Sequence, residues 1–152
     1  MKDRHGSARK DIVQISWDDV MEMCRDLAVK VDSEFAPHII LGIAKAGVIP
    51  AVIIASILRK DFYPVKISRR YRDRVVKDKP ELMIPLTDEV SGKNVLIVDE
   101  IAASGETLRL AKREAEKKGA RKVRTLTLYV RSDSYMPSYY ALQTDSLIIQ
   151  PW

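Results

Sequence analysis

The chain has 152 residues and a formal net charge of +5, and its composition is 46% hydrophobic and 31% charged. That length suffices for one domain with a hydrophobic core and is short for two. No apolar run approaches the roughly 20 residues of a membrane-spanning helix. The polar start, residues 1–11, shows no apolar signal segment and is expected to be flexible. Cys24 is the only cysteine, which excludes an intrachain disulfide and makes the cytoplasm the default compartment.

Hydrophobic periodicity and turn residues predict helices and strands in alternation. The expected elements, in chain order, are a helix over 17–32, a strand over 38–44, a helix over 47–58, a strand over 63–68, a short strand at 82–85, a turn at 91–93, a strand over 94–99, a helix over 106–118, a strand over 123–130 and a short apolar tail at 145–152. Ser16 should cap the first helix in a capping box with Asp19, and Cys24 should lie on its buried face. This order predicts an α/β fold with a parallel, doubly wound sheet in one domain.

Three loops of unusual composition follow expected strands. They are residues 42–47 (GIAKAG), 68–79 with a basic run, and 99–107 (DEIAASGET). In an open parallel sheet, ligands bind beyond the carboxyl ends of the strands. We therefore expect the three loops to line one crevice.

The turn that follows residue 101 is built for close approach of a ligand to the backbone. Its small residues are Ala102, Ala103, Ser104 and Gly105. A helix expected to begin near Glu106 directs unpaired amides and the positive end of its dipole at this turn. Ser104 and Thr107 add hydroxyl donors. We expect a terminal phosphate to bind here.

Two adjacent carboxylates, Asp99 and Glu100, precede the turn. Because carboxylates repel phosphate, their natural partners are the vicinal hydroxyls of a ribose or a magnesium ion held by them. An ordinary strand-to-helix turn with a capping acid is the structural alternative, but it requires neither two acids nor four small residues. The pattern predicts phosphate on the turn and a sugar diol on the acids.

The run RRYRDRVVKDK, residues 69–79, carries six basic side chains and two aspartates, a local net charge of +4. Such a loop favours a polyanion, either nucleic acid or a small phosphorylated substrate. A solvated, mobile loop is the alternative. Tyr71 is its only aromatic residue, too few for a base-stacking platform, so nucleic acid is the least favoured partner.

The motifs resemble those of type I phosphoribosyltransferases. VLIVDEIAASGETL, residues 95–108, looks like the family's motif for phosphoribosyl pyrophosphate (PRPP), and GIAKAGVIPA, residues 42–51, is similar to its pyrophosphate loop. ISRRYRDR occupies the place of a mobile loop, and the closing DSLIIQPW is similar to the C-terminal hood of the xanthine-guanine and hypoxanthine enzymes. The resemblance covers roughly residues 38–152. It implies a single-domain, Rossmann-like parallel sheet with a small hood, and transfer of ribose 5-phosphate from PRPP to a purine (guanine, hypoxanthine or xanthine) with release of pyrophosphate.

The resemblance also implies roles for individual residues. The catalytic set would be Lys45, Asp99 and Glu100, with both acids on the ribose hydroxyls and Glu100 near a Mg²⁺ ion. The residues that would hold the 5-phosphate are Ala102, Ala103, Ser104, Gly105, Glu106 and Thr107. Pyrophosphate would contact Lys45, Ala46 and Gly47 beneath a flexible loop that begins with Ser68, Arg69, Arg70 and Tyr71. Leu147 and Ile148 would flank the base, with Arg131 at its exocyclic oxygen.

Two departures from the family pattern support a second hypothesis. Ala103 stands where the oxopurine enzymes usually have an Asp near purine N7, and Glu106 adds a negative charge beside the phosphate. A protein that senses PRPP or a nucleotide without turnover would tolerate both. Enzymes of this fold commonly dimerise, so the resemblance also implies a homodimer, with no membrane partner.

Overall fold

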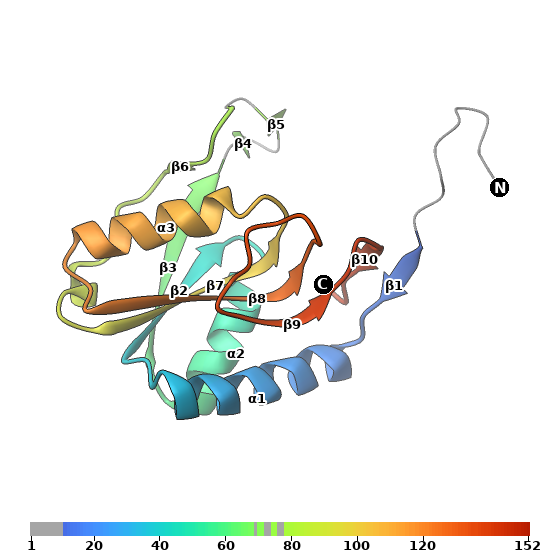
Figure 1. Cartoon of the computed structure of the whole chain (residues 1–152), viewed down its shortest axis with the longest axis horizontal. Coiled ribbons are helices and arrows are strands. Elements are labelled where there is room, and N and C mark those ends of the chain that lie inside the picture. The colour runs from blue at the N-terminus through green and yellow to red at the C-terminus, as the bar shows by residue number, and fades with distance from the viewer. Residues whose placement is uncertain (1–10, 69, 72–73, 76–77) are drawn as a thin grey trace.

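The computed structural model describes residues 11–68, 70–71, 74–75 and 78–152, and helices cover both faces of its central sheet (Figure 1). Residues 1–10, which are most of the segment expected to be flexible, lie outside this description. The elements are β1 (Ile12–Gln14), α1 (Trp17–Glu34), β2 (Ile39–Ala44), α2 (Val48–Leu58), β3 (Asp61–Ser68), β4 (Arg70–Tyr71), β5 (Arg74–Val75), β6 (Glu81–Leu82), the 3-10 turn η1 (Asp88–Val90), β7 (Asn94–Ala102), α3 (Glu106–Lys117), β8 (Lys122–Val130), β9 (Tyr139–Gln143) and β10 (Leu147–Ile149).

The six-stranded sheet has the order β6-β3-β2-β7-β8-β9. All neighbouring strands in it run parallel except β6, which pairs antiparallel with β3. Strands β2, β7 and β8 each contain a run of at least four consecutive buried residues because both faces of the sheet are covered. The prediction of an α/β fold with a parallel, doubly wound sheet is confirmed.

The two faces of the sheet have separate hydrophobic clusters. On one face, α1 and α2 pack Val20, Leu27 and Ile54 against inward-facing strand residues such as Leu96 and Leu126. On the other face, the apolar stripe of α3 packs onto the sheet; its buried residues are Leu108, Ala111 and Ala115. Figure 1 shows α3 on the side opposite to α1 and α2. The sheet is therefore packed between α1 and α2 on one face and α3 on the other, which holds the carboxyl ends of its strands in place.

The chain changes direction across the sheet between β2 and β7. After β2 it continues through α2 to β3 on one side, whereas β7 leads through α3 to β8 on the other. The loops that leave β2 and β7 thus diverge to opposite faces and open a crevice between them. This position is where ligands bind in open α/β sheets.

The first helix forms as its sequence predicts. Ser16 accepts a hydrogen bond from the amide of Asp19, and the Asp19 carboxylate accepts one from the amide of Ser16, which completes the capping box. Cys24 is fully buried on the inner face of α1. Burial raises the pKa of the Cys24 thiol to about 11, so Cys24 is an inert core residue.

Several short elements were not predicted. β9 joins the sheet edge parallel to β8 through a connection, residues 131–138, that contains no helix. β1 pairs with β10 in a separate two-stranded parallel sheet near the C-terminus, which we call the hood. The ring centroids of Trp17 and Trp152 lie 5.7 Å apart beside it. Segments from both ends of the chain therefore build the hood, not the tail alone.

The basic segment after β3 contains the antiparallel pair β4–β5, in which Arg70 faces Val75 and Tyr71 faces Arg74. Arg69 and the residues 72–73 and 76–77 lie outside the described part of the chain, so the expected mobility of this loop stays a prediction. The chain then returns through β6, where Glu81 and Leu82 replace the strand expected at 82–85.

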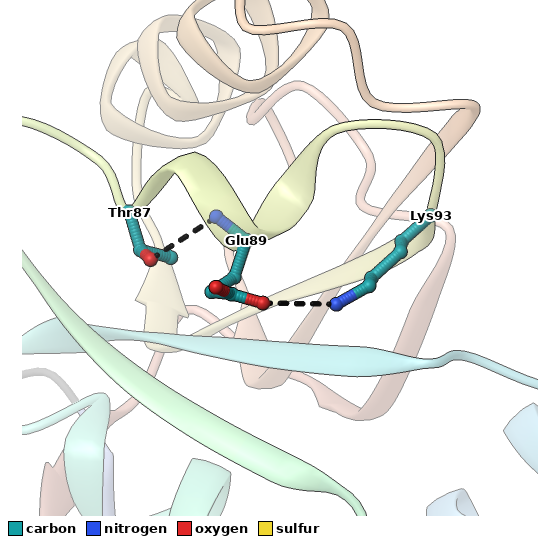
Figure 2. A network of polar contacts seen from close by, with 3 residues as sticks. All are labelled: Thr87, Glu89 and Lys93. Atoms are coloured by element: carbon teal, nitrogen blue, oxygen red, sulfur yellow. Dashed lines mark hydrogen bonds and ion pairs between the residues drawn. The ribbon is translucent and has the colours of Figure 1, made fainter.

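The turn that leads into β7 is fixed by local polar contacts (Figure 2). Thr87 Oγ1 accepts a hydrogen bond from the amide of Glu89 and caps η1. The Glu89 carboxylate then pairs with Lys93 Nζ at 3.2 Å. Among the described residues, no helix is long and apolar enough to span a membrane.

Candidate active site

The turn between β7 and α3 borders a surface hollow of about 130 Å³. Its lining comprises Pro80, Asp99 and the continuous stretch 101–108. Within the part of the chain that the structure describes, the amides of Ala103, Ser104, Gly105 and Thr107 have no protein acceptor. The Glu106 amide differs, because it donates to Ser104 Oγ at 3.3 Å. Several unpaired donors at a helix N-terminus make this turn suitable for an anion.

Gly105 gives the turn its shape. It has φ +83°, a conformation that side-chain-bearing residues rarely adopt, and it directly precedes α3. A Cβ placed on Gly105 would lie 2.4 Å from Cβ of Tyr135, which crosses the turn from the 131–138 connection. The guanidinium of Arg109 lies 4.7 Å from the centroid of the Tyr135 ring. Glycine is therefore required here both by the backbone and by packing.

Asp99 and Glu100 lie within the last part of β7, because this strand extends to Ala102 instead of ending at 99 as predicted. The ladder with β8 continues past them, with Asp99 opposite Thr127 and Ile101 opposite Tyr129. Both acids thus have rigid backbone positions at the mouth of the crevice.

Asp99 is partly buried and its environment is unfavourable for a charge. Burial raises the pKa of Asp99 from 3.8 to about 7; a hydrogen bond from the amide of Glu100 opposes this rise and the charge of Glu100 adds to it. That amide lies 2.7 Å from Asp99 Oδ1. The carboxyl group is therefore held in one orientation, and partners that donate hydrogen bonds or carry positive charge would favour its ionised form.

The loop after β2 touches Asp99 directly. A Cβ on Gly47 would lie 2.8 Å from Asp99 Cα and 2.9 Å from Asp99 Oδ1, so glycine permits the two loops to meet. The peptide bond between Ala44 and Lys45 is cis, and Lys45 is exposed. In the described residues, the amides of Ala46 and Gly47 have no protein acceptor. The loop after β2 therefore lies against Asp99, whereas a crevice shared by all three loops stays a prediction.

A wider hollow of about 460 Å³ also borders Ala103. Its other lining residues are Arg131, Ser132, Asp133 and Asp145. The backbone amide of Arg131 donates to the carbonyl of Ala102, and its Nη1 donates to the carbonyl of Thr144 at 2.9 Å and to that of Ser146. Arg131 thus connects the end of β7 to the start of the hood, at the edge of a hollow large enough for an aromatic base.

The two hood residues expected to flank a base point to different sides of β10. Leu147 is 52% exposed, whereas Ile148 is partly buried against the core cluster of α1 and α2. Alternation along a strand separates neighbouring side chains in this way. The structure places Leu147, not Ile148, at the surface.

Two residues at the site were not predicted from the sequence. Tyr135 packs on the turn at Gly105, and Gln150 donates from Nε2 to Glu100 Oε1 at 2.6 Å. Gln150 stands in the tail segment that resembles a hood, but its partner lies far away in the sequence and no local pattern indicates it. Of the expected loop residues, Ser68 ends β3 and Arg70 and Tyr71 form β4, whereas Arg69 lies outside the described residues.

The donor set fits a magnesium ion that arrives with a substrate. Within the described residues there is no group of three or more His, Cys, Asp or Glu side chains that could hold a metal alone. Asp99 lines the hollow at the turn, and Glu100 follows it in β7. Mg²⁺ is commonly bound by one or two carboxylates together with substrate phosphates and water, which is the arrangement these residues allow.

The similarity of this chain to known proteins identifies its family. A model of the phosphoribosyl transferase domain matches residues 16–152. The chain belongs to this family. Hypoxanthine-guanine phosphoribosyltransferase from Schizosaccharomyces pombe is 31% identical over 129 residues, which cover 73% of this chain and 63% of the relative. The chain thus spans less than two thirds of that relative's length.

Solved structures of this phosphoribosyltransferase family share the fold. Purine phosphoribosyltransferase from Pyrococcus horikoshii Ot3 is 30% identical with a TM-score of 0.83, and the match covers 93% of each chain. Xanthine-guanine-hypoxanthine phosphoribosyltransferase from Helicobacter pylori matches with a TM-score of 0.76 at 16% identity, over 93% of this chain and 92% of the other. The second likeness concerns the fold alone.

Proposed function

We propose that this chain is a purine phosphoribosyltransferase that moves ribose 5-phosphate from PRPP to guanine, hypoxanthine or xanthine and releases pyrophosphate. The observation that carries the proposal lies where the loops after β2 and β7 diverge to opposite faces of the sheet. There, the turn with unpaired amides and Asp99 line one hollow, and Gly47 lies against Asp99. The named functions of the Schizosaccharomyces pombe and Pyrococcus horikoshii relatives support the purine.

Each part of PRPP has a proposed partner. The 5-phosphate binds the amides of the turn, with hydroxyl groups from Ser104 and Thr107. Asp99 and Glu100 accept hydrogen bonds from the ribose hydroxyls. Pyrophosphate binds Lys45 and the amides of Ala46 and Gly47, under the loop that contains Ser68, Arg69, Arg70 and Tyr71. In this arrangement the acids face the sugar and the amides face the phosphates, as their charges require.

In the proposed reaction, a purine nitrogen forms a bond to the anomeric carbon of ribose as the bond from that carbon to pyrophosphate breaks. The electron pair of the broken bond leaves with pyrophosphate, and the purine loses a proton. Magnesium, when bound, neutralises charge on the pyrophosphate. The protein's contribution is electrostatic and positional: Lys45 stabilises the leaving group, and the acids orient the sugar whose carbon becomes electron-deficient. No protein nucleophile takes part, in agreement with the inert Cys24.

The base is proposed to occupy the hollow beside Ala103, where Arg131 and Leu147 approach it from the hood side; Ile148 supports the hood from beneath. Asp133 and Asp145 line the same hollow and offer carboxylate acceptors near the base. The Asp145 carboxylate also accepts a hydrogen bond from the amide of Ser132 at 3.1 Å. We further propose that the whole chain is one domain that acts as a homodimer in the cytoplasm.

The test is an assay of pyrophosphate release with PRPP and magnesium against guanine, hypoxanthine, xanthine, adenine, uracil and orotate. We expect turnover with at least one 6-oxopurine and none with uracil or orotate. PRPP binding without turnover of any base would favour the sensor hypothesis instead. The Ala103→Asp variant should then be assayed, because it restores the acid that oxopurine enzymes usually have at this position.

A further inference from the structure

A chain of three side chains connects the candidate active site to the C-terminus. The hydroxyl of Tyr129 donates to Gln150 Oε1 at 3.0 Å, and Gln150 Nε2 donates to Glu100 Oε1 at 2.6 Å. Tyr129 is fully buried on β8, and Glu100 and Gln150 are partly buried. These contacts bring together residues that are far apart in the sequence.

The chemistry of the three groups allows one low-energy arrangement. A carboxylate only accepts hydrogen bonds, so the amide must present its NH₂ group to Glu100. The amide oxygen then faces Tyr129, whose hydroxyl donates to it. If the amide were flipped, its oxygen would face the carboxylate with no proton between them. Glu100 therefore determines which way the Gln150 amide faces, and the second hydrogen bond, from Tyr129, holds the amide against Glu100.

Glu100 needs such support more than a shorter acid would. A glutamate side chain has one more rotatable bond than aspartate, and an unrestrained glutamate loses more conformational entropy when a ligand orders it. A hydrogen bond to a charged group is also stronger than one between neutral groups. The 2.6 Å contact can thus hold the carboxylate in place before a ligand binds.

Gln150 also belongs to the hood. It directly follows β10, whose residues Leu147–Ile149 pair with β1. Two residues later, Trp152 lies with its ring centroid 5.7 Å from that of Trp17, the first residue of α1. A displacement of Gln150 would therefore be transmitted to the surroundings of Trp152.

We infer that Gln150 is a positioning residue, which holds the Glu100 carboxylate toward the sugar and metal of the substrate and couples their binding to the C-terminal segment 147–152. The inference deepens the proposed function and rests on it. A purely structural role of Gln150 would stabilise the hood without affecting the affinity of Glu100 for its ligand. The two possibilities differ in measurable ways.

The decisive variant is Gln150→Leu, which removes both hydrogen bonds at similar side-chain size. Gln143→Leu is the matched control, because Gln143 is an exposed glutamine at the end of β9. Tyr129→Phe keeps the Glu100 contact possible but removes the second hydrogen bond that holds the amide. Circular dichroism and denaturant unfolding show whether each variant folds. If Gln150→Leu does not fold, Tyr129→Phe provides the test.

Calorimetric titration with magnesium–PRPP gives the first readout. We expect Gln150→Leu to weaken binding by about tenfold, as for loss of a hydrogen bond to a charged group. Tyr129→Phe should weaken it less and Gln143→Leu not at all. In turnover assays the KM for PRPP should rise while kcat changes less than about twofold, because the bond acts on Glu100 before reaction.

Tryptophan fluorescence gives a second readout that needs no turnover, since Trp17 and Trp152 are the only tryptophans. Magnesium–PRPP should change the emission of the wild-type protein, and this change should shrink in Gln150→Leu. Equal affinity and equal fluorescence change in a folded Gln150→Leu variant would overturn the inference alone. Failure of the wild-type protein to bind magnesium–PRPP would overturn the proposed function, and the inference with it.

Discussion

Replacement of Asp99 by asparagine should weaken ligand binding and at the same time stabilise the empty protein. Asparagine has nearly the same shape and can still accept the hydrogen bond from the Glu100 amide. It removes the negative charge that burial disfavours and that Glu100 repels. A residue kept for binding at the expense of stability should show this pair of opposite effects.

The size of the stabilisation follows from the pKa. An aspartate with a pKa of 3.8 in the unfolded chain and about 7 in the folded protein differs by about three units, which corresponds to about 4 kcal/mol at 1.36 kcal/mol per unit. Because Asp99 keeps some contact with solvent and its surroundings can relax, we expect about 2 kcal/mol at pH 8.

The pH dependence of stability follows from the same pKa. Between pH 4 and 7 the unfolded chain releases the Asp99 proton while the folded protein retains it, so this group lowers the free energy of unfolding as the pH rises through that window. Above about pH 7 the loss is complete. Asp99→Asn lacks this contribution, so it should gain at pH 8 and gain little at pH 4.

Denaturant unfolding of both proteins at pH 4 and pH 8, without ligand, measures the effect. Asp88→Asn is the control, because Asp88 is exposed and its hydrogen bond to Lys118 lowers its pKa, the opposite direction. A variant Asp99→Asn that is less stable than wild type at pH 8 would refute the reasoning about burial. Calorimetry should show PRPP binding weakened by about tenfold, and unchanged affinity would remove Asp99 from the site.

Two further predictions concern the phosphate turn and the core. Gly105→Ala should destabilise the fold by about 1–3 kcal/mol and weaken PRPP binding, because the new Cβ would meet Tyr135 and the φ of this residue is positive. The control in denaturant unfolding and calorimetry is Gly92→Ala, because Gly92 has φ +72° but open space around it. An equal loss of stability in both variants would show that the Tyr135 contact is unimportant. Cys24→Ser should lower the free energy of unfolding by about 1–3 kcal/mol because it buries a hydroxyl, yet leave turnover of the folded protein unchanged; loss of kcat in this variant would contradict a mechanism without a protein nucleophile.

The regular core could be predicted from the sequence because its signals are local. The apolar runs of β2 and β7, the capping box of Ser16 and Asp19, and the stripe of Leu108, Ala111 and Ala115 each specify an element within a few residues. The alternation of these elements then determines the parallel sheet. The position of the turn between β7 and α3 follows from the same information, because it needs only the end of one strand and the start of one helix.

The hood could not be predicted in the same way. β1 and β10 span only Ile12–Gln14 and Leu147–Ile149, too short for periodicity, and they pair across almost the whole chain. β9 follows β8 without a helix, whereas parallel strands usually require a longer crossover. The prediction that β7 ends at Asp99 was wrong for a related reason: pairing with β8, not the local composition, extends it to Ala102.

Side-chain contacts between distant segments could not be predicted from the sequence either. Nothing near Gln150 indicates Glu100, and nothing near Tyr135 indicates Gly105, because these pairs form only when the hood and the 131–138 connection pack on the end of the sheet. The raised pKa of Asp99 is likewise a consequence of burial against neighbouring segments. The sequence indicates which residue types meet at the crevice, and tertiary packing determines their orientation and charge.

A crystal structure of the protein with magnesium and PRPP, or with ribose 5-phosphate, tests the central claim most directly. The account predicts that the 5-phosphate lies against the backbone amides of 103–107, within hydrogen-bond distance of Ser104 and Thr107, and that the ribose hydroxyls face Asp99 and Glu100. A ligand phosphate bound elsewhere, with the amides of 103–107 paired to protein atoms, would contradict the account.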